Sequence, residues 1–396
     1  MQPIRRVSLL FLILWLALIC GSSVKSSAAD GSDAAKSPHV RTYYIAVDEL
    51  AWDYAPSGID QISGKPFDEM ERVYTARGPH RIGKVYRKAI YREYTDGSFT
   101  TLKPRLASDR YLGILGPILH AEVGDTIKVV FKNNATRPYS LHPHGVFYKK
   151  DSEGMNYNDG SSAKDKKGVV LPGLTHTYVW NVPERAGPGP NDPSSIVWLY
   201  HSHVDEQKDV DSGLVGAIIV TARGMAKADG TPKDVDREFV ALFNIFDENQ
   251  SWYLEQNIRA YTYDPKGTEK AAVKGETIPV GTNGVFSLNG TGFGDSNLKY
   301  TINGYIYGNM PKMVMKRGER VRWYLIAIGF GFNFHSPHWH GNTVLQNKQR
   351  TDVISLAPAQ MVTVDMIPDD PGIWLFHCHV SDHMAGGMTA LYQVDP

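Results

Sequence analysis

One segment of this 396-residue chain occurs twice. Trp198-Leu-Tyr-His-Ser-His-Val204 recurs as Trp374-Leu-Phe-His-Cys-His-Val380, and His142-Pro-His-Gly145 recurs upstream as His338-Trp-His-Gly341. Each copy is preceded by an alternating run that a turn residue opens, at 124–131 and 318–325, and begins with a β-branched and aromatic run, at 42–47 and 238–243. A repeat of this kind indicates two copies of one structural unit.

The composition favours an all-β unit. The chain holds 37 Gly and 23 Pro for turns, together with 21 Tyr, 14 Phe and 8 Trp, which strands accommodate well. Helical periodicity is scarce apart from a short stretch near 251–259. We therefore expect two β-sandwich domains, at 30–223 and 237–396, joined by a polar, glycine-containing linker at 224–236.

The N-terminus has the features of an export signal. Arg5 and Arg6 precede an apolar run from Val7 to Cys20, and small residues at 27–29 offer a cleavage site. We expect residues 1–29 to be a cleaved signal peptide and the protein to be secreted or periplasmic. No later segment is long and apolar enough for a membrane span. Lys plus Arg and Asp plus Glu balance at 42 each, which argues against a nucleic-acid partner.

Removal of the signal would leave Cys378 as the one remaining cysteine. An exported protein without a disulfide must be held together by large cores or by metal. A buried, inert thiol is one interpretation of Cys378. Its neighbours His377 and His379 favour a metal site instead.

Strand geometry sorts the possible ligands of the second copy into two groups. Residues two apart in a strand point to the same face, and adjacent residues point to opposite faces. One group therefore contains the two His-x-His pairs, and the other contains Cys378 and His335. The first group is His338, His340, His377 and His379.

The second group gains His383 and Met388 from the turn that follows the strand. Two imidazoles, a thiolate and a weak axial thioether form a blue-copper electron-transfer site. Met384 competes with Met388 for the axial position. A structural zinc site is the alternative, although a thioether is a poor ligand for zinc and favours copper.

The first copy repeats only half of this set. Alignment places Tyr139, Ser202, Gln207 and Ser212 opposite the four blue-copper residues, so each of those ligands is absent. The His-x-His pairs persist as His142, His144, His201 and His203. Eight histidines on two domains exceed what one ion can use, and a cluster of three copper ions shared across a domain interface accounts for them.

These four segments resemble the four copper-binding motifs of multicopper oxidases. Beyond the motifs, 247–255 and 201–205 are similar to the ceruloplasmin and hephaestin group, and the likeness extends over most of the mature chain. The resemblance implies cupredoxin-like Greek-key sandwiches and one type 1, one type 2 and two type 3 copper ions per functional unit. It also implies that His142 and His338 hold the type 2 ion, and that the type 3 pair is held by His144, His201, His203, His340, His377 and His379.

The implied activity couples one-electron oxidation of a reductant to four-electron reduction of O₂ to water. Asp205 is a candidate proton relay, with a solvated loop carboxylate as the alternative. Asp295 and Asp382 are candidates for guiding Fe(II), because carboxylates suit a hard ion. Tyr300 stands where ferroxidases of this group have a histidine, so Cu(I) or a phenol remains an alternative reductant. Met310, Met313 and Met315 could bind Cu(I), but core packing is the commoner role.

Ceruloplasmin-like proteins arrange six such domains in a ring. A two-domain chain could form the same ring as a homotrimer with a cluster at each subunit junction. The alternatives are a copper storage or structural module without turnover and a copper nitrite reductase. Nitrite reductases carry the Cys-bearing site in the first domain, where this chain has Ser202.

Overall fold

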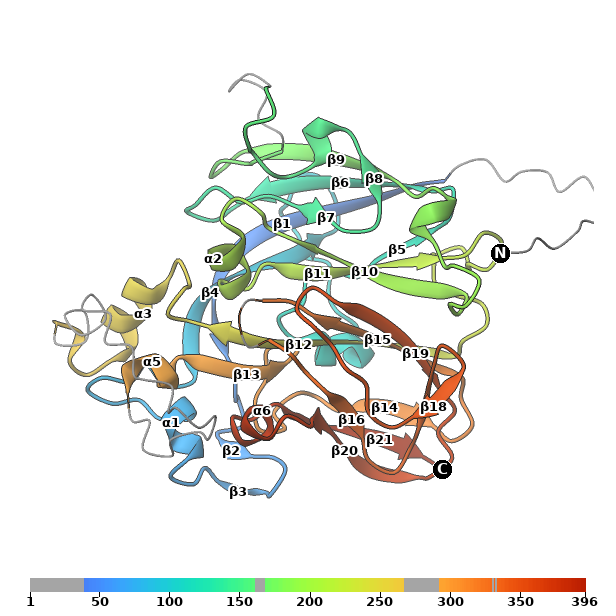
Figure 1. Ribbon diagram of the computed structural model, residues 1–396. Helices are drawn as coiled ribbons and strands as arrows, with labels where there is room; N and C mark the ends of the chain where they lie inside the picture. Colours follow the sequence, from blue (N-terminus) through green and yellow to red (C-terminus); the bar gives the residue numbers. More distant parts are fainter. Residues whose placement is uncertain (1–38, 161–167, 267–291, 330, 332) are drawn as a thin grey trace, which may run out of the picture. The chain divides into compact units, whose positions relative to one another are not determined.

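A computed structural model of the chain describes residues 39–160, 168–266, 292–329, 331 and 333–396, and Figure 1 labels its elements. The first half contains two sheets. The five-stranded sheet has the order β4 (Val85–Tyr94), β1 (Val40–Asp53), β6 (Thr126–Asn133), β9 (Thr175–Asn181) and β8 (Phe147–Tyr148). The four-stranded sheet has the order β5 (Leu119–Glu122), β11 (Val215–Thr221), β10 (Ser195–His201) and β7 (His142–Pro143).

The second half repeats this plan. Its six-stranded sheet has the order β13 (Leu298–Ile302), β12 (Arg237–Asp247), β15 (Val321–Ala327), β19 (Met361–Met366), β17 (Val344–Gln346) and β18 (Gln349–Thr351). Its four-stranded sheet has the order β14 (Met313–Lys316), β21 (Thr389–Asp395), β20 (Gly372–Cys378) and β16 (Pro337–Trp339). A small ribbon pairs β2 (Ile59–Asp60) with β3 (Lys65–Pro66). We call the two repeats the first and second sheet pairs.

The repeat extends to strand direction. β1 runs antiparallel to β4 and parallel to β6, and β12 runs antiparallel to β13 and parallel to β15. The strands expected at 42–47 and 238–243 lie within β1 and β12, and those expected at 124–131 and 318–325 overlap β6 and β15, which confirms the all-β prediction. Alternation of buried and solvent-facing residues along β6 and β9 is what a half-buried strand requires.

Helices are short and lie between strands. The α-helices are α1 (Glu71–Thr75), α2 (Glu206–Asp211), α3 (Leu254–Tyr261), α5 (Phe293–Ser296) and α6 (Ser381–Ala385). The 3₁₀ turns are η1 (Ala107–Leu112), η2 (Lys150–Ser152) and η3 (Glu184–Ala186). α3 occupies most of the short stretch expected near 251–259, whereas α2 and α6 follow the two histidine-bearing strands and therefore position the candidate sites.

The apolar core is not divided cleanly between the halves. One cluster contains Tyr178, Trp180 and other residues of the first sheet pair. The other joins the whole core of the second pair to residues of the first, including Tyr54, Tyr86 and Leu199. The two sheet pairs therefore share apolar packing on this face.

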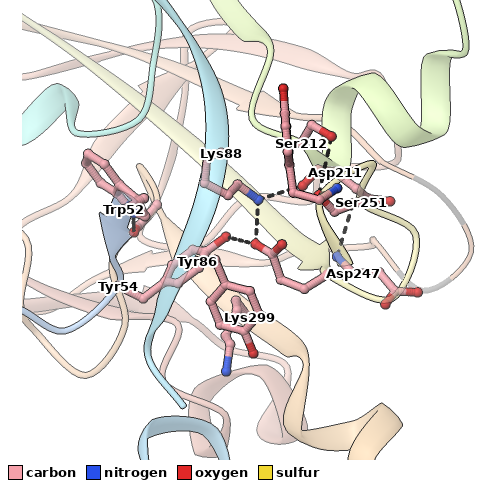
Figure 2. A network of polar contacts seen from close by, with 12 residues as sticks. Trp52, Tyr54, Tyr86, Lys88, Asp211, Ser212, Asp247, Ser251 and Lys299 are labelled. Carbon is pink, nitrogen blue, oxygen red and sulfur yellow. Dashed lines mark hydrogen bonds and ion pairs between the residues drawn. The ribbon is translucent and has the colours of Figure 1, made fainter. Parts of the chain in front are cut away.

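A buried polar network accompanies this shared packing (Figure 2). Lys88 of β4 donates to the Glu248 carboxylate that follows β12 and to the main-chain oxygen of Asp211 at the end of α2. Tyr54 donates to the same carboxylate. Lys88 and Glu248 are both 0% exposed, so their charges neutralise each other away from solvent.

The segment 224–236 also makes defined contacts. Asp236 pairs with Arg320, and Arg322 pairs with Asp234 and with Asp365 of β19. The boundaries of the signal peptide, linker and domains stay predictions, and the proposed signal lies outside the described residues. Among those residues no helix has the length and apolar character needed to cross a membrane.

Candidate metal centres

The thiol of Cys378 lies between two imidazoles in the second sheet pair. Its Sγ is 4.0 Å from Nδ1 of His335 and 3.6 Å from Nδ1 of His383. All three side chains are buried, and their ligand atoms lie within 4.8 Å of one another. Cys378 ends β20, whereas α6 carries His383, so the turn between them folds the imidazole back onto the sulfur.

Two methionines could complete this group, and they differ in burial. Met388 is fully buried and its main-chain oxygen accepts a hydrogen bond from the Cys378 N–H at 3.1 Å. Met384 is 44% exposed on α6. Burial beside the thiol favours Met388 as the axial residue.

Burial also sets the charge state of these ligands. It lowers the pKa of His335 to about 3 and that of His383 to about 4, and it raises the pKa of the Cys378 thiol. Neutral imidazoles have lone pairs available for a metal. Because a thiolate buried without a cation would be unfavourable, the two neutral imidazoles, the sulfur and the thioether fit a blue-copper ion.

A second group lies on the other side of Cys378. Nδ1 of His338 is 3.0 Å, and Nε2 of His340 is 3.1 Å, from Nε2 of His377. The ring of His379 is 5.2 Å from that of His338. A hollow of about 500 Å³, lined by His338, His340, Asp352 and others, opens beside them.

The first sheet pair carries a matching group. Nε2 of His144 is 3.2 Å from Nε2 of His201, and the ring of His142 lies 5.0 Å from that of His203. The pairing of β7 with β10 sets His142 opposite His201, as the pairing of β16 with β20 sets His338 opposite His377. Burial lowers the pKa of His144 to about 4 and holds the pKa of His201 well below its usual range.

Hydrogen bonds to carbonyl oxygens orient several of these rings. Nδ1 of His142 donates to the Glu153 oxygen at 2.7 Å, and Nδ1 of His377 donates to the Cys378 oxygen at 2.9 Å. Nδ1 of His201 bonds the Ser202 oxygen in the same way. Each bond leaves the opposite nitrogen as the lone-pair donor, which is how metal-binding imidazoles are usually held.

The two histidine groups remain separate within the chain. Among the described residues, no ring contact, hydrogen bond or close ligand set joins a histidine of the first sheet pair to one of the second. Some of these imidazoles are open to solvent. His340 and His379 of the second group are exposed. The eight histidines therefore do not form one cluster within the described residues.

Two family models match the sequence, and both describe a multicopper oxidase. One matches residues 112–224 and the other residues 277–396, so together they span more than half of the chain. Ferroxidase HEPHL1 of Homo sapiens is 45% identical over 90% of this chain and 29% of its own length. The chain belongs to the multicopper oxidase family.

Within the multicopper oxidases, the relatives are ceruloplasmin- and hephaestin-like. Hephaestin of Rattus norvegicus is 40% identical over 97% of this chain and 31% of its own length. Ceruloplasmin of Homo sapiens is 39% identical over 89% of this chain and 30% of its own length. The chain thus spans about a third of the length of these curated relatives.

Solved multicopper oxidase structures share the fold at lower identity. One multicopper oxidase crystal structure has a TM-score of 0.55 and 20% identity, covering 90% of this chain and 89% of that chain. The blue copper oxidase from Nitrosomonas europaea has a TM-score of 0.53 and 17% identity, covering 90% and 86%. These matches confirm the cupredoxin-like fold.

The first sheet pair of this multicopper oxidase chain lacks a type 1 group, as expected from the sequence. Two of the residues that take the places of the missing ligands differ from those expected. His201 of β10 pairs with Val215, whereas His377 of β20 pairs with Thr389. The first connection is therefore two residues longer. Leu214 takes the place of Met388, and Asp209 that of His383, so the pairing with Ser212 and Gln207 is wrong. Tyr139 and Ser202 keep the places assigned to them.

The candidate proton relay has another role in the structure. Asp205 is the N-cap of α2, where its side chain accepts the Lys208 N–H at 3.5 Å and pairs with the Lys208 ammonium at 3.1 Å. Glu206, which the sequence reasoning missed, is the carboxylate beside the histidines, 3.4 Å from His203 and 3.9 Å from His201. The carboxylate beside the histidines is Glu206 and not its neighbour Asp205, because α2 begins here and the Asp205 side chain turns toward the backbone of the helix.

The carboxylates expected to guide a reductant lie near the type 1 group. Asp295 is on α5 and Asp382 on α6, and both contribute to the raised pKa of Tyr300, which burial chiefly causes. The Tyr300 ring lies 5.5 Å from that of His383, and the Tyr74 ring meets Tyr300 edge-on at 5.7 Å. Burial also raises the pKa of Asp295.

The methionine run at 310–315 belongs to the core. Met313 and Met315 are 0% exposed and Met310 is 3% exposed, all within the apolar cluster of the second sheet pair. Core packing, the commoner role for such a run, is therefore the correct interpretation.

Proposed function

We propose that this chain is a copper enzyme that oxidises a reductant one electron at a time and reduces O₂ to water. The observation that supports it is the set of three groups of possible metal ligands. One group contains the Cys378 sulfur, and the triplet 377–379 connects it to a histidine group. His335, Cys378, His383 and Met388 would hold the type 1 ion. His142 and His338 would hold the type 2 ion, and the type 3 pair would be held by His144, His201, His203, His340, His377 and His379.

Bound copper would supply one-electron redox chemistry and the site at which O₂ is reduced. The chain itself provides the connection between the two kinds of site. Cys378 is covalently bonded to both His377 and His379, and the Cys378 oxygen accepts from Nδ1 of His377 at 2.9 Å. Packing fixes the neutral imidazoles in place before metal binds, so little reorganisation is needed.

Fe(II) is the reductant that we propose. The relatives include proteins named ferroxidases, and Asp295 and Asp382 lie on the two short helices next to the type 1 group. Carboxylate oxygens suit iron better than they suit Cu(I). A phenol is the second candidate, because buried Tyr300 stacks on His383 where a ferroxidase of this group would have a histidine.

The functional unit that we propose is a secreted or periplasmic homotrimer. Each subunit would contribute its first histidine group to one junction and its second to another, and such head-to-tail contacts close under threefold symmetry. Exposed apolar side chains flank both groups, with Val204 39% exposed beside His203 and Val353 38% exposed opposite His338. Asp205 stays a predicted proton relay.

Oxygen uptake by the copper-loaded protein tests the proposal, with Fe(II), Cu(I) and a simple phenol as separate reductants. We expect Fe(II) to be preferred, and the double variant Asp295→Asn, Asp382→Asn to raise the KM for Fe(II) about tenfold or more while turnover of the phenol is unchanged. Unchanged Fe(II) kinetics in the variant would remove the role of the two aspartates. A blue protein without uptake from any reductant would contradict the oxidase function.

A further inference from the structure

The histidine-bearing loops of the two sheet pairs occupy equivalent places but are held by different contacts. In the second pair the Cys378 Sγ accepts the Ser336 N–H at 3.3 Å. In the first pair the Ser202 Oγ accepts the Ser140 N–H at 3.1 Å. Ser202 thus replaces the thiol at the centre of the loop in the sheet pair that lacks the equivalents of His335 and His383.

A buried carboxylate occupies the place of the missing imidazole. Asp209 is 0% exposed. Its Oδ2 accepts from the Ser202 hydroxyl at 2.7 Å, the Val204 N–H at 3.0 Å and the Asp205 N–H at 3.2 Å. Three donors that flank His203 therefore converge on one oxygen.

The second oxygen of Asp209 is held from the other half of the chain. Its Oδ1 accepts from the indole N–H of Trp252 at 2.9 Å. The Arg137 guanidinium lies 4.6 Å, and the Lys208 ammonium 4.3 Å, from the Trp252 ring. Because Trp252 follows β12, the second sheet pair fixes the carboxylate that supports the histidine loop of the first.

We propose that Asp209 is a positioning residue for His201 and His203, replacing by hydrogen bonds the support that the sulfur and its metal give to His377 and His379. Ser202 joins the two histidines covalently, so a displacement of its hydroxyl moves both. Hydrogen bonds to a carboxylate are stronger than those between neutral groups. Three of them hold the loop to Asp209, and the fourth, from Trp252, holds the carboxylate itself. The inference rests on the proposed function, because it assigns a purpose to the precise placement of these histidines.

Copper affinity at the histidine groups tests this, measured by competition with a chelator and by the type 2 EPR signal. Asp209→Ala is expected to weaken copper binding there about 10- to 100-fold, the usual effect of removing a residue that orients a metal ligand. The blue absorption, which depends on the second sheet pair alone, is expected to persist and reports that the chain is folded. Trp252→Phe, which removes only the indole donor, is expected to give a smaller loss of the same kind.

Asp211→Ala is the matched control for Asp209→Ala. It makes the same kind of change in the same helix at a buried site, but its Oδ1 accepts from the Asp247 N–H rather than from the histidine loop. We expect wild-type copper affinity in this variant. Equal losses in the two variants would assign the effect to general damage to α2 and overturn the proposal.

Wild-type affinity and an unchanged EPR signal in Asp209→Ala would also overturn it. If Asp209→Ala lacks the blue absorption because it does not fold, Asp209→Asn decides, since the amide keeps the size but can accept through one oxygen only. A several-fold loss of affinity there supports the proposal, and no loss overturns it. Failure of the wild-type protein to consume O₂ would instead contradict the proposed function, because copper affinity is measured without turnover.

Discussion

The environments of Met384 and Met388 make the axial ligand testable at the level of a single side chain. Met388 is 0% exposed, whereas Met384 is 44% exposed. We expect Met388→Leu to keep the blue absorption and change the type 1 reduction potential, because the axial thioether tunes the potential without generating the colour. Met384→Leu should leave both unchanged, and Cys378→Ser should abolish colour and O₂ uptake. A changed potential in Met384→Leu with none in Met388→Leu would reverse the assignment.

Glu49 carries a pH dependence of stability. Its Oε1 accepts from the Thr136 N–H at 2.8 Å and from the Tyr253 hydroxyl at 2.8 Å, and its Oε2 pairs with Arg87. Burial alone would raise the pKa of Glu49, but the hydrogen bonds from Thr136 and Arg87 outweigh it and lower the pKa from 4.5 to about 2. This stabilisation is therefore complete above pH 4.5 and is lost as the pH falls through about 2.

Replacing Glu49 should remove that dependence. We expect Glu49→Gln to lower the free energy of unfolding by about 1–3 kcal/mol at pH 7. The difference from wild type should shrink as the pH falls from 4.5 toward 2. Urea unfolding at several pH values measures both effects. A difference that stays constant over this range would show that the carboxylate charge does not contribute.

Among the secondary-structure elements, the strands were predictable from sequence and the connections were not. Alternation and an opening turn residue place β6, where one buried face imposes a period of two. The same sequence pattern places β15, although that strand is buried along its whole length. The same argument puts His338, His340 and Cys378 into two groups, as the structure does. The two extra residues after β10 change no strand pattern, so Asp209 and Leu214 could be found only from the pairing of β10 with β11. Glu206 was missed because the start of α2 depends on its cap.

The shared packing between β4 and β12 could not be predicted from the sequence either. No sequence pattern pairs Lys88 with Glu248, yet they form a fully buried ion pair. Among the described residues, the second oxygen of Glu248 has no hydrogen-bond partner, so the carboxylate depends on Lys88 and Tyr54. Burial raises the pKa of Glu248 and the Lys88 ammonium opposes that shift.

Breaking this pair should destabilise the contact between the sheet pairs. We expect Lys88→Met to lower the free energy of unfolding by about 3–5 kcal/mol, because it leaves a buried carboxylate without its counter-charge. The double variant Lys88→Met, Glu248→Leu should recover most of that loss, since neither member of the pair is then left buried without the other. Urea denaturation of the metal-free protein measures both. A double variant no more stable than Lys88→Met would show that packing, rather than charge, accounts for the loss.

For the molecule as a whole, the separation of the two histidine groups bears on the proposed homotrimer, in which each cluster would form between chains. His144 belongs to the first group and His340 to the second, and no described contact joins the groups within one chain. His144→Ala and His340→Ala should therefore each abolish O₂ uptake while keeping the blue absorption, because Cys378 and its partners are untouched in both.

Mixing the two inactive variants provides the decisive measurement. In a trimer that contains both, a junction at which a His340→Ala chain supplies its intact first group and a His144→Ala chain its intact second group holds all eight histidines. Random assembly makes about a quarter of the junctions intact, so co-expression should restore roughly a quarter of the wild-type rate. A cluster formed within one chain could not be restored in this way, because every chain in the mixture lacks one ligand. Absence of any recovery in trimers shown to contain both variants would therefore contradict the shared cluster.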